Sequence, residues 1–317
     1  MRNKNAGPWR LLAAVGFVVT LACGCAGQPA VDDDVDDAVD HGGSLVSEEG
    51  QIAFTRATKF NWTNWTSSES DIYAINVDGL RERRLTDSPG LDAVPAWAPD
   101  GERLSFVSAL EGGNSEIYVM DADGSGQRRL THTSLYEFFL AWSPDGERIA
   151  YSASDSDYNA TIWMMDADGS ARTQLASGAF PSWSPDGERI AYTAYFAERS
   201  YLAVMNADGS ERRGLGDASL IRRFTNTAEL SEQPAWSPDG KKIAFASMED
   251  GEIYAMNVDG SERTRLTDIP SYEHWPPTWS GYRGRSGSCT QKGDSFGGGV
   301  LDIATANFRE FLFHALG

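Results

Sequence analysis

A pentapeptide that recurs along the chain constrains its fold more than any other feature. Trp-Ser-Pro-Asp-Gly occurs three times unchanged, one further copy has Ala in place of Ser, and another copy is truncated after Ser-Gly. A recurring period of about 20–50 residues indicates a protein built from repeated structural units. The tryptophans of this motif are spaced 45, 41, 53 and 43 residues apart: Trp97, Trp142, Trp183, Trp236 and Trp279.

Each repeat has the pattern of short antiparallel strands joined by tight turns. Ser-Pro-Asp-Gly fits a type I turn, because Pro presets φ at the second position and Gly is favoured at the fourth. A strand such as 149–151 follows, then a loop of variable length. The next strand ends in Asn or Asp, any residue, Asp and Gly, which is a hairpin-turn pattern. A last strand ends near Leu-Thr or its equivalent.

Four short strands per repeat predict an all-β fold, and specifically a β-propeller. One small sheet cannot bury both of its faces, whereas radially stacked blades bury them and leave only short edges. We expect six blades of four antiparallel strands, with residues 280–317 as a degenerate last blade in which Leu301–Asn307 echoes the strand before the hairpin turn. The alternative is a ring of five blades with a foreign tail. A small residue precedes each motif Trp, as suits a strand near the axis: Ala96, Ala141, Ser182, Ala235 and Thr278.

The repeat unit, from Trp-Ser-Pro-Asp-Gly through Ile-Tyr-x-Met-Asn-x-Asp-Gly to Leu-Thr, resembles the WD-like propeller repeat of the TolB family over about residues 48–280. The resemblance implies a non-catalytic cell-envelope scaffold that docks a protein or peptide on one propeller face. TolB proteins carry an α/β domain ahead of the propeller, where this sequence has only a signal segment and an acidic tether. We therefore expect a TolB-like protein that is not TolB itself, and the partners of TolB are not carried over to it.

Residues 1–25 have the pattern of a targeting segment. Arg2, Lys4 and Arg10 precede an apolar run over 11–21, which is too short for a typical membrane span. The run leads into Cys23 and Cys25, which resemble the cysteine of a bacterial lipobox. Cys25 is the preferred lipidation site and Cys23 the second choice; the alternative is an ordinary secretory signal peptide. The expected location is the cell envelope, on the periplasmic side of the outer membrane or on the cell surface.

Charge limits the partners of the mature chain. Residues 26–47 hold six aspartates between 32 and 40, and such a block of like charge stays extended, as a tether would. Removal of residues 1–25 leaves 24 basic and 46 acidic residues, a formal net charge of −22. This balance argues against a nucleic-acid partner and against broad adhesion to anionic lipid. We expect a monomer, held to the membrane by its lipid alone.

Candidate chemistry is sparse. Asp121 and Asp123 begin like a calcium loop, but position twelve of an EF-hand requires Glu and is here His132, so we interpret the run as a hairpin turn. The cysteine and histidine spacing fits no disulfide framework or metal site. We therefore predict no cofactor, no metal and no catalytic residue. The alternative is a propeller enzyme, a lyase or hydrolase acting on envelope or extracellular carbohydrate.

The variable loops predict which face binds. Label the strands of a blade A to D from the axis outward: the short A–B and C–D turns then share one face, and the B–C loops and D–A crossovers share the other. Insertions on one face of a repeat protein often mark the binding face, and aromatic and Arg side chains are common anchors. Alternatively, Trp62 and Trp65 cover the first blade as a lid. The candidate residues are Trp62, Trp65, Tyr136, Phe138, Phe139, Arg222, Arg223, Phe224, Tyr272 and Trp275.

Overall fold

All regular secondary structure in the described part of the chain is β-strand. A search of the same residues finds no helix long and apolar enough to cross a membrane. The structure is a computed structural model, and it describes residues 19–20, 51–61, 66–76, 81–109, 114–157, 159–196, 199–215, 222–223, 233–247, 252–267, 278–279 and 301–302. The predicted all-β class is thereby confirmed.

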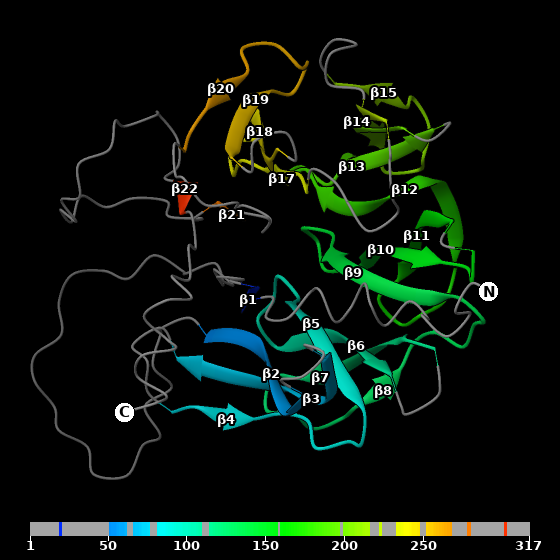
Figure 1. Ribbon diagram of the computed structural model, residues 1–317, viewed down its shortest axis with the longest axis vertical. Helices are drawn as coiled ribbons and strands as arrows, with labels where there is room; N and C mark the ends of the chain where they lie inside the picture. Colours follow the sequence, from blue (N-terminus) through cyan, green and yellow to red (C-terminus); the bar gives the residue numbers. More distant parts are fainter. Residues whose placement is uncertain are drawn as a thin grey trace, which may run out of the picture.

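The strands form antiparallel blades set around a central axis, as in a propeller (Figure 1). Neighbouring blades are also linked into larger sheets, by a single parallel pairing of Ser70 with Leu91 between the first and second blades and by one shared strand between the third and fourth. The first blade has β2 (Gln51–Asn61), β3 (Thr66–Asn76) and β4 (Arg83–Arg84). The second has β5 (Leu91–Trp97), β6 (Arg103–Ala109), β7 (Glu116–Asp121) and β8 (Arg128–Arg129). The third has β9 (Tyr136–Trp142), β10 (Arg148–Ser154), β11 (Ala160–Asp166) and the first half of β12 (Thr173–Trp183).

The fourth blade takes the second half of β12 and adds β13 (Arg189–Phe196), β14 (Arg199–Asn206) and β15 (Arg213–Gly214), and β16 (Arg222–Arg223) pairs with β14. The fifth has β17 (Ala235–Trp236), β18 (Lys242–Ala246), β19 (Ile253–Asn257) and β20 (Thr264–Arg265). Outside these blades, β1 (Val19–Thr20) pairs with β2, and β21 (Thr278–Trp279) pairs with β22 (Leu301–Asp302).

The two tight turns of a blade lie on the same face, as predicted. In the third blade, the N–H of Gly146 donates to Ser143 O at 2.9 Å within the A–B turn, and the N–H of Gly169 donates to Asp166 O at 2.8 Å within the C–D turn. A hydrogen bond of 2.8 Å from the N–H of Ala167 to Glu147 O joins the two turns. Since equivalent bonds recur in the second, fourth and fifth blades, we call this side the turn face and the opposite side the loop face.

The hydrophobic core is divided among the interfaces between blades. One cluster joins Ala96 and Ile117 of the second blade to Trp142 and Tyr151 of the third, all buried. Comparable clusters lie between the first and second, third and fourth, and fourth and fifth blades. Each blade therefore depends on its neighbours for burial of its apolar faces, as expected of a repeat protein.

The inner strands begin earlier than predicted. The sequence pattern predicts that blades two and three start near Pro95 and Leu140, each two residues before a motif Trp. In the structure β5 begins at Leu91 and β9 at Tyr136. A β-bulge explains the difference, because one extra residue lets the strand resume pairing after an irregular step. The register shifts in β5, β9 and β12 coincide with positive φ values of 54°, 48° and 59° at Val94, Phe139 and Phe180.

One predicted crossover loop does not exist. Strand β12 runs directly from the third blade into the fourth, with Ala176 paired to Ile162 of β11 and Ala179 paired to Thr193 of β13. Gly178 lies where the strand changes partner, with φ of 148°, and a Cβ atom there would lie 2.2 Å from the carbonyl oxygen of Thr193. The crossover needs no loop because a glycine lets the chain pass this close.

The predicted last blade is only partly described. Leu301 pairs with Trp279, just as Ile149 pairs with Trp142 and Ile243 with Trp236. Leu301 therefore takes the place of strand B. The sequence pattern had predicted strand C, because Leu301–Asn307 resembles the strand before the hairpin turn. The rest of 280–317 lies outside the described residues, so the number of blades stays a prediction.

Candidate protein-binding face

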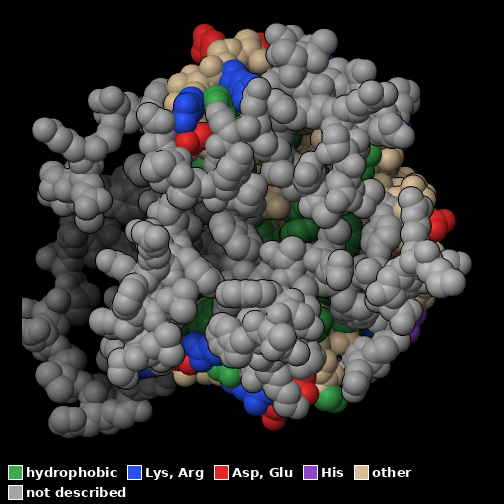
Figure 2. Space-filling model, in the orientation of Figure 1, with side chains coloured by type: hydrophobic (Ala, Val, Ile, Leu, Met, Phe, Trp, Pro, Cys, Tyr) green, Lys and Arg blue, Asp and Glu red, His purple; other side chains and the backbone are tan. Residues whose placement is uncertain are grey.

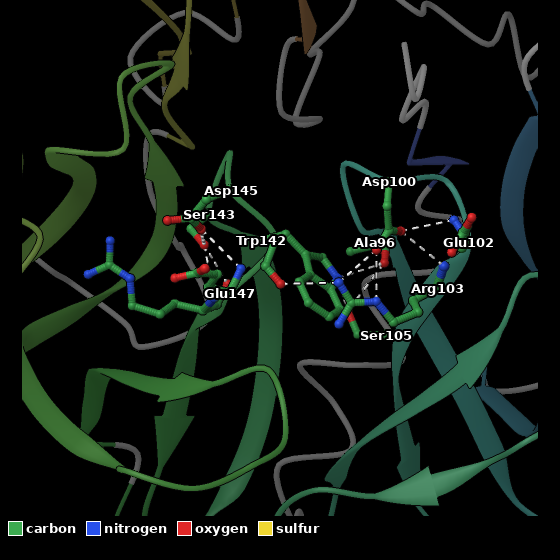
Figure 3. A network of polar contacts seen from close by, with 11 residues as sticks. Ala96, Asp100, Glu102, Arg103, Ser105, Trp142, Ser143, Asp145 and Glu147 are labelled. Atoms are coloured by element: carbon green, nitrogen blue, oxygen red, sulfur yellow. Dashed lines mark hydrogen bonds and ion pairs between the residues drawn. The ribbon is translucent and has the colours of Figure 1, made fainter. Parts of the chain in front are cut away.

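The motif tryptophans join successive blades. Trp142 Nε1 of the third blade donates to Ala96 O at 3.1 Å and to Ser105 Oγ at 2.9 Å, both in the second blade (Figure 3). Trp183 Nε1 repeats the bond to Ala141 O at 3.0 Å. The repeated Trp is therefore a structural connector and is not available to a ligand.

The turn face is likewise made of repeated contacts between blades. The turn glycine of one blade lies close to the turn proline of the preceding blade. A Cβ atom added to Gly146 would lie 3.6 Å from Cδ of Pro99, and one added to Gly187 would lie 3.6 Å from Cδ of Pro144. Nearer the rim, arginines reach carbonyl oxygens of the next blade. These bonds are Arg83 to Ala122 O at 2.9 Å, Arg128 to Asp168 O at 2.8 Å and Arg213 to Val258 O at 3.0 Å.

The aspartates of the turns stabilise the turns themselves. Asp145 Oδ1 accepts the N–H of Glu147 at 3.0 Å, and hydrogen bonds from Ser143 and Glu147 lower the pKa of Asp145. Asp123 Oδ1 accepts the N–H of Ser125 at 2.8 Å. This arrangement supports the interpretation of Asp-x-Asp-Gly as a hairpin turn. Within the described ranges no three His, Cys, Asp or Glu side chains gather in a way that could hold a metal ion.

The loop face has two kinds of junction between blades. Ser70 Oγ donates to Asp92 O at 2.9 Å between the first and second blades, and Ser115 Oγ donates to Glu137 O at 2.8 Å between the second and third. The third and fourth blades are joined by the continuous strand β12 instead. The loop face is thus the side on which this propeller departs from its own repeat.

An aromatic cluster lies at the loop-face end of the third and fourth blades, and consists of Phe138, Phe139, Phe180 and Tyr195. The ring centres of Phe138 and Phe139 are 5.3 Å apart in an edge-on arrangement, and those of Phe139 and Phe180 are 4.2 Å apart. Hydrophobic side chains also show near the middle of the axial view in Figure 2. An apolar surface of this kind suits contact with a protein or peptide.

The cluster corrects part of the predicted site. Tyr136, Phe138 and Phe139 were placed in a crossover loop, but they belong to strand β9. Phe138 is only 7% exposed and packs in the core, so it is not a surface anchor. Tyr136 and Phe139 are half-buried. Phe180 was missed as a member of this cluster, although it precedes Trp183 by the same three residues that separate Phe139 from Trp142. It is only 6% exposed, so it is no surface anchor either.

The backbone of the cluster adopts an unusual conformation. Positive φ is uncommon for residues other than glycine, and bulky residues held there mark strain that often accompanies a functional site. The N–H of Phe180 donates to Ser152 Oγ at 3.0 Å, and the N–H of Val94 donates to Thr55 Oγ1 at 3.2 Å. Hydroxyl groups of the preceding blade thus stabilise two of the three bulges.

The remaining candidates are not tested by the structure. Arg222 and Arg223 form β16, whose backbone pairs with Ser200 and Arg199 at the start of β14. The others lie outside the described residues: Cys23, Cys25, Trp62, Trp65, Phe224, Tyr272 and Trp275.

The fold and its repeated motifs define the class as a β-propeller of WD-like repeats. The TolB beta propeller domain family matches residues 57–220, just over half of the chain, and the chain belongs to this family.

Solved structures share this fold. TolB from Acinetobacter baumannii superposes with a TM-score of 0.53 at 20% identity, over 67% of this chain and 51% of that one. A protein assigned as TolB from Agrobacterium tumefaciens superposes with a TM-score of 0.53 at 21% identity, and the match covers 69% of this chain and 77% of that one. An oligogalacturonate lyase in complex with manganese superposes with a TM-score of 0.50 at 17% identity, and the match covers 64% of this chain and 60% of the lyase. Identities this low show the fold alone.

Relatives in sequence match over short stretches. The "Uncharacterized peptidase YuxL" of Bacillus subtilis is 42% identical over 60 residues, which is 18% of this chain and 9% of YuxL. The Tol-Pal system protein TolB of Thioalkalivibrio sulfidiphilus is 34% identical over 82 residues, 24% of this chain and 19% of that protein. The matched stretches thus span less than a fifth of either relative.

Proposed function

We propose that this chain is a lipid-anchored, non-catalytic scaffold of the bacterial cell envelope that binds a protein or peptide on its loop face. The observation that carries the proposal is the contrast between the two faces. Repeated turn and inter-blade bonds occupy the turn face, whereas the loop face carries the aromatic cluster, the strained inner-strand bulges and two kinds of junction between blades. Strain and partly exposed aromatic side chains, here Phe139 and Tyr195, are typical of recognition sites.

Membership of the TolB propeller family supports a binding role, and the resemblance of residues 1–25 to a lipoprotein signal supports the envelope location. The acidic charge of the chain favours a partner with basic groups, because complementary charge speeds association. The two basic residues of β16 lie beside the start of β14, at the loop-face end of the fourth blade, where they would contact acidic groups of the same partner.

The proposal is tested by crosslinking in intact cells that express the full chain, followed by identification of the crosslinked proteins. Phe139→Ala, Arg223→Ala and Trp65→Ala should each reduce crosslinking to the main partner without lowering the melting temperature by more than a few degrees. Glu147→Arg and Glu188→Arg, which reverse exposed charges beside the turns, are the matched controls and should leave crosslinking unchanged.

Loss of the partner in the turn-face variants, with binding kept in the loop-face variants, would refute the choice of face. The enzyme alternative has its own test, because a lyase shares the fold. Purified chain that cleaves oligogalacturonate in the presence of manganese would show that the scaffold role is wrong.

A further inference from the structure

Two pairs of buried carboxylates occupy equivalent positions at the loop-face ends of adjacent blade junctions. In each pair one acid lies on strand C and the other near the start of strand A of the next blade. The pairs are Asp71 with Asp92, and Glu116 with Glu137, and all four residues are at most 3% exposed. We call them the first and second carboxylate pairs.

One residue of the crossover holds both acids of the second pair. The N–H of Thr133 donates to Glu116 Oε1 at 3.1 Å, and Thr133 Oγ1 donates to Glu137 Oε1 at 2.6 Å. Arg129 adds an ion pair to Glu116 Oε1 at 2.6 Å. The other two oxygens, Oε2 of Glu116 and Oε2 of Glu137, are buried and have no hydrogen-bond partner among the described residues.

The first pair repeats this pattern with shorter side chains. Arg84 forms an ion pair with Asp71 Oδ2 at 2.7 Å, and Ser88 Oγ donates to Asp92 Oδ2 at 2.6 Å. Oδ1 of each aspartate is buried and has no partner in the described part of the chain. Both members of both pairs thus keep one buried acceptor oxygen without a hydrogen-bond donor among the described residues, which calls for one common explanation.

A proton is the simplest explanation. Two buried carboxylates with unpaired oxygens carry a large desolvation cost, and two like charges at one site cannot both ionise readily. One proton removes a charge and turns one unpaired acceptor into a donor. Arg84 and Arg129 each form an ion pair with a single carboxylate of their pair, so the second negative charge of each pair has no ion-pair partner among the described residues.

The groups around Glu137 favour its neutral form on balance. The pKa of Glu137 is raised to about 7, chiefly by burial; the charge of Glu116 adds to this rise, whereas Thr133 and Arg172 oppose it. Arg172 Nε itself donates to the hydroxyl of Tyr151 at 2.9 Å. Burial likewise raises the pKa of Asp71; Arg84 opposes this, and Asp92 and Asp87 add to it. His132, in the same crossover as Thr133, is exposed.

We propose that each carboxylate pair holds one proton in the folded protein, and that release of this proton to solvent loosens the crossovers carrying Ser88 and Thr133. The loop face of the first three blades would then respond to pH. The inference goes beyond the proposed scaffold function, because it holds whatever the loop face binds. The junction of the third and fourth blades supplies an internal comparison, since Thr161 and Gly178 stand at the equivalent positions and carry no carboxyl group.

The test compares amide hydrogen exchange of the full chain at pH 5 and pH 8, corrected for the intrinsic rate. In the wild type, amides 131–137 should exchange about tenfold faster at pH 8, the factor that one pKa unit represents. In Glu137→Gln, a neutral stand-in for the protonated acid, the change should be under about twofold. Glu147→Gln, an exposed acid on the turn face, is the matched control and should behave as the wild type.

If Glu137→Gln fails to fold, Asp92→Asn tests the first carboxylate pair in its place. The change in corrected exchange between pH 5 and pH 8 is then measured at amides 86–92, and it should be smaller in Asp92→Asn than in the wild type. A wild type whose corrected exchange is equal at both pH values would overturn the proposal. So would protection of these amides by millimolar calcium chloride at pH 8, because a bound cation would then account for the buried oxygens.

Discussion

Arg103 of the second blade stacks on Trp142 of the third, with 5.0 Å between the guanidinium carbon and the centre of the indole ring. Arg148 and Trp183 repeat the contact at 4.8 Å, and Arg189 and Trp236 at 4.9 Å. The arginine two residues after the Pro-Asp-Gly turn of one blade thus covers the Trp that precedes this turn in the next blade. The contact recurs at three successive junctions, those that join the second blade through to the fifth.

Removal of this Trp should therefore weaken the whole ring. We expect Trp142→Ala to lower the free energy of unfolding by about 3–5 kcal/mol, the usual cost of deleting a large buried aromatic side chain. Denaturant unfolding followed by circular dichroism measures the change. A loss under about 1 kcal/mol would mean that the indole is not a buried connector.

A second comparison isolates the indole hydrogen bond. Trp142→Phe loses two bonds from Nε1 and should cost about 1 kcal/mol more than Trp97→Phe. Trp97 Nε1 is buried and has no partner among the described residues, so its removal loses no such bond. Equal costs in the same unfolding experiment would show that the bonds to the preceding blade add nothing.

Gly178 should tolerate no side chain. Gly178→Ala would place a methyl group 2.2 Å from Thr193 O, so the continuous crossover between the third and fourth blades must shift. Gly101→Ala is the control, because φ is also positive, at +70°, but no atom lies within 4 Å. We expect the control to cost about 1–2 kcal/mol from backbone strain, and Gly178→Ala to cost clearly more. Similar melting temperatures for the two variants would contradict the close approach.

The turn aspartates should make the protein sensitive to acid. Hydrogen bonds from Ser143 and Ser184 lower the pKa of Asp145 and Asp186, respectively, so each ionised carboxylate stabilises the folded state. This stability is present above the ordinary pKa of about 3.9 and is lost as the pH falls through the lower folded-state value. The melting temperature of the wild type should therefore drop between pH 5 and pH 2.5.

Asp145→Asn checks the cause, because the amide cannot ionise. Its melting temperature should lie below that of the wild type at pH 6 and approach it at pH 2.5. Asp157→Asn alters an exposed aspartate outside these turns and serves as the control. A gap between Asp145→Asn and the wild type that is unchanged by pH would rule out ionisation as the source.

Anchoring is predicted from the sequence alone. The wild type should partition with membranes, and replacement of both Cys23 and Cys25 by Ser should release it into the soluble fraction. The single replacements should identify the lipidated residue, with Cys25→Ser expected to have the larger effect. A wild type that already fractionates as soluble would show that the lipobox interpretation is wrong.

The aromatic residues show where sequence reasoning was limited. The prediction placed Tyr136, Phe138 and Phe139 in a loop because the Pro or Leu two residues before Trp looked like the start of the strand. The observed bulge extends β9 to Tyr136 and buries Phe138 while leaving Phe139 half-buried. A bulge depends on cross-strand pairing with Tyr151 and Ser152, which a linear pattern does not reveal.

The repeat, the strands, the turns and the sharing of one face by both turns could be predicted from the sequence, because these features depend on residues close together in the chain. Which partner each repeated residue contacts became clear from the three-dimensional structure. Gly178 brings β12 against Thr193, and Thr133 holds Glu116 and Glu137 together. These groups meet across blade junctions, and their contacts depend on how one blade packs on the next.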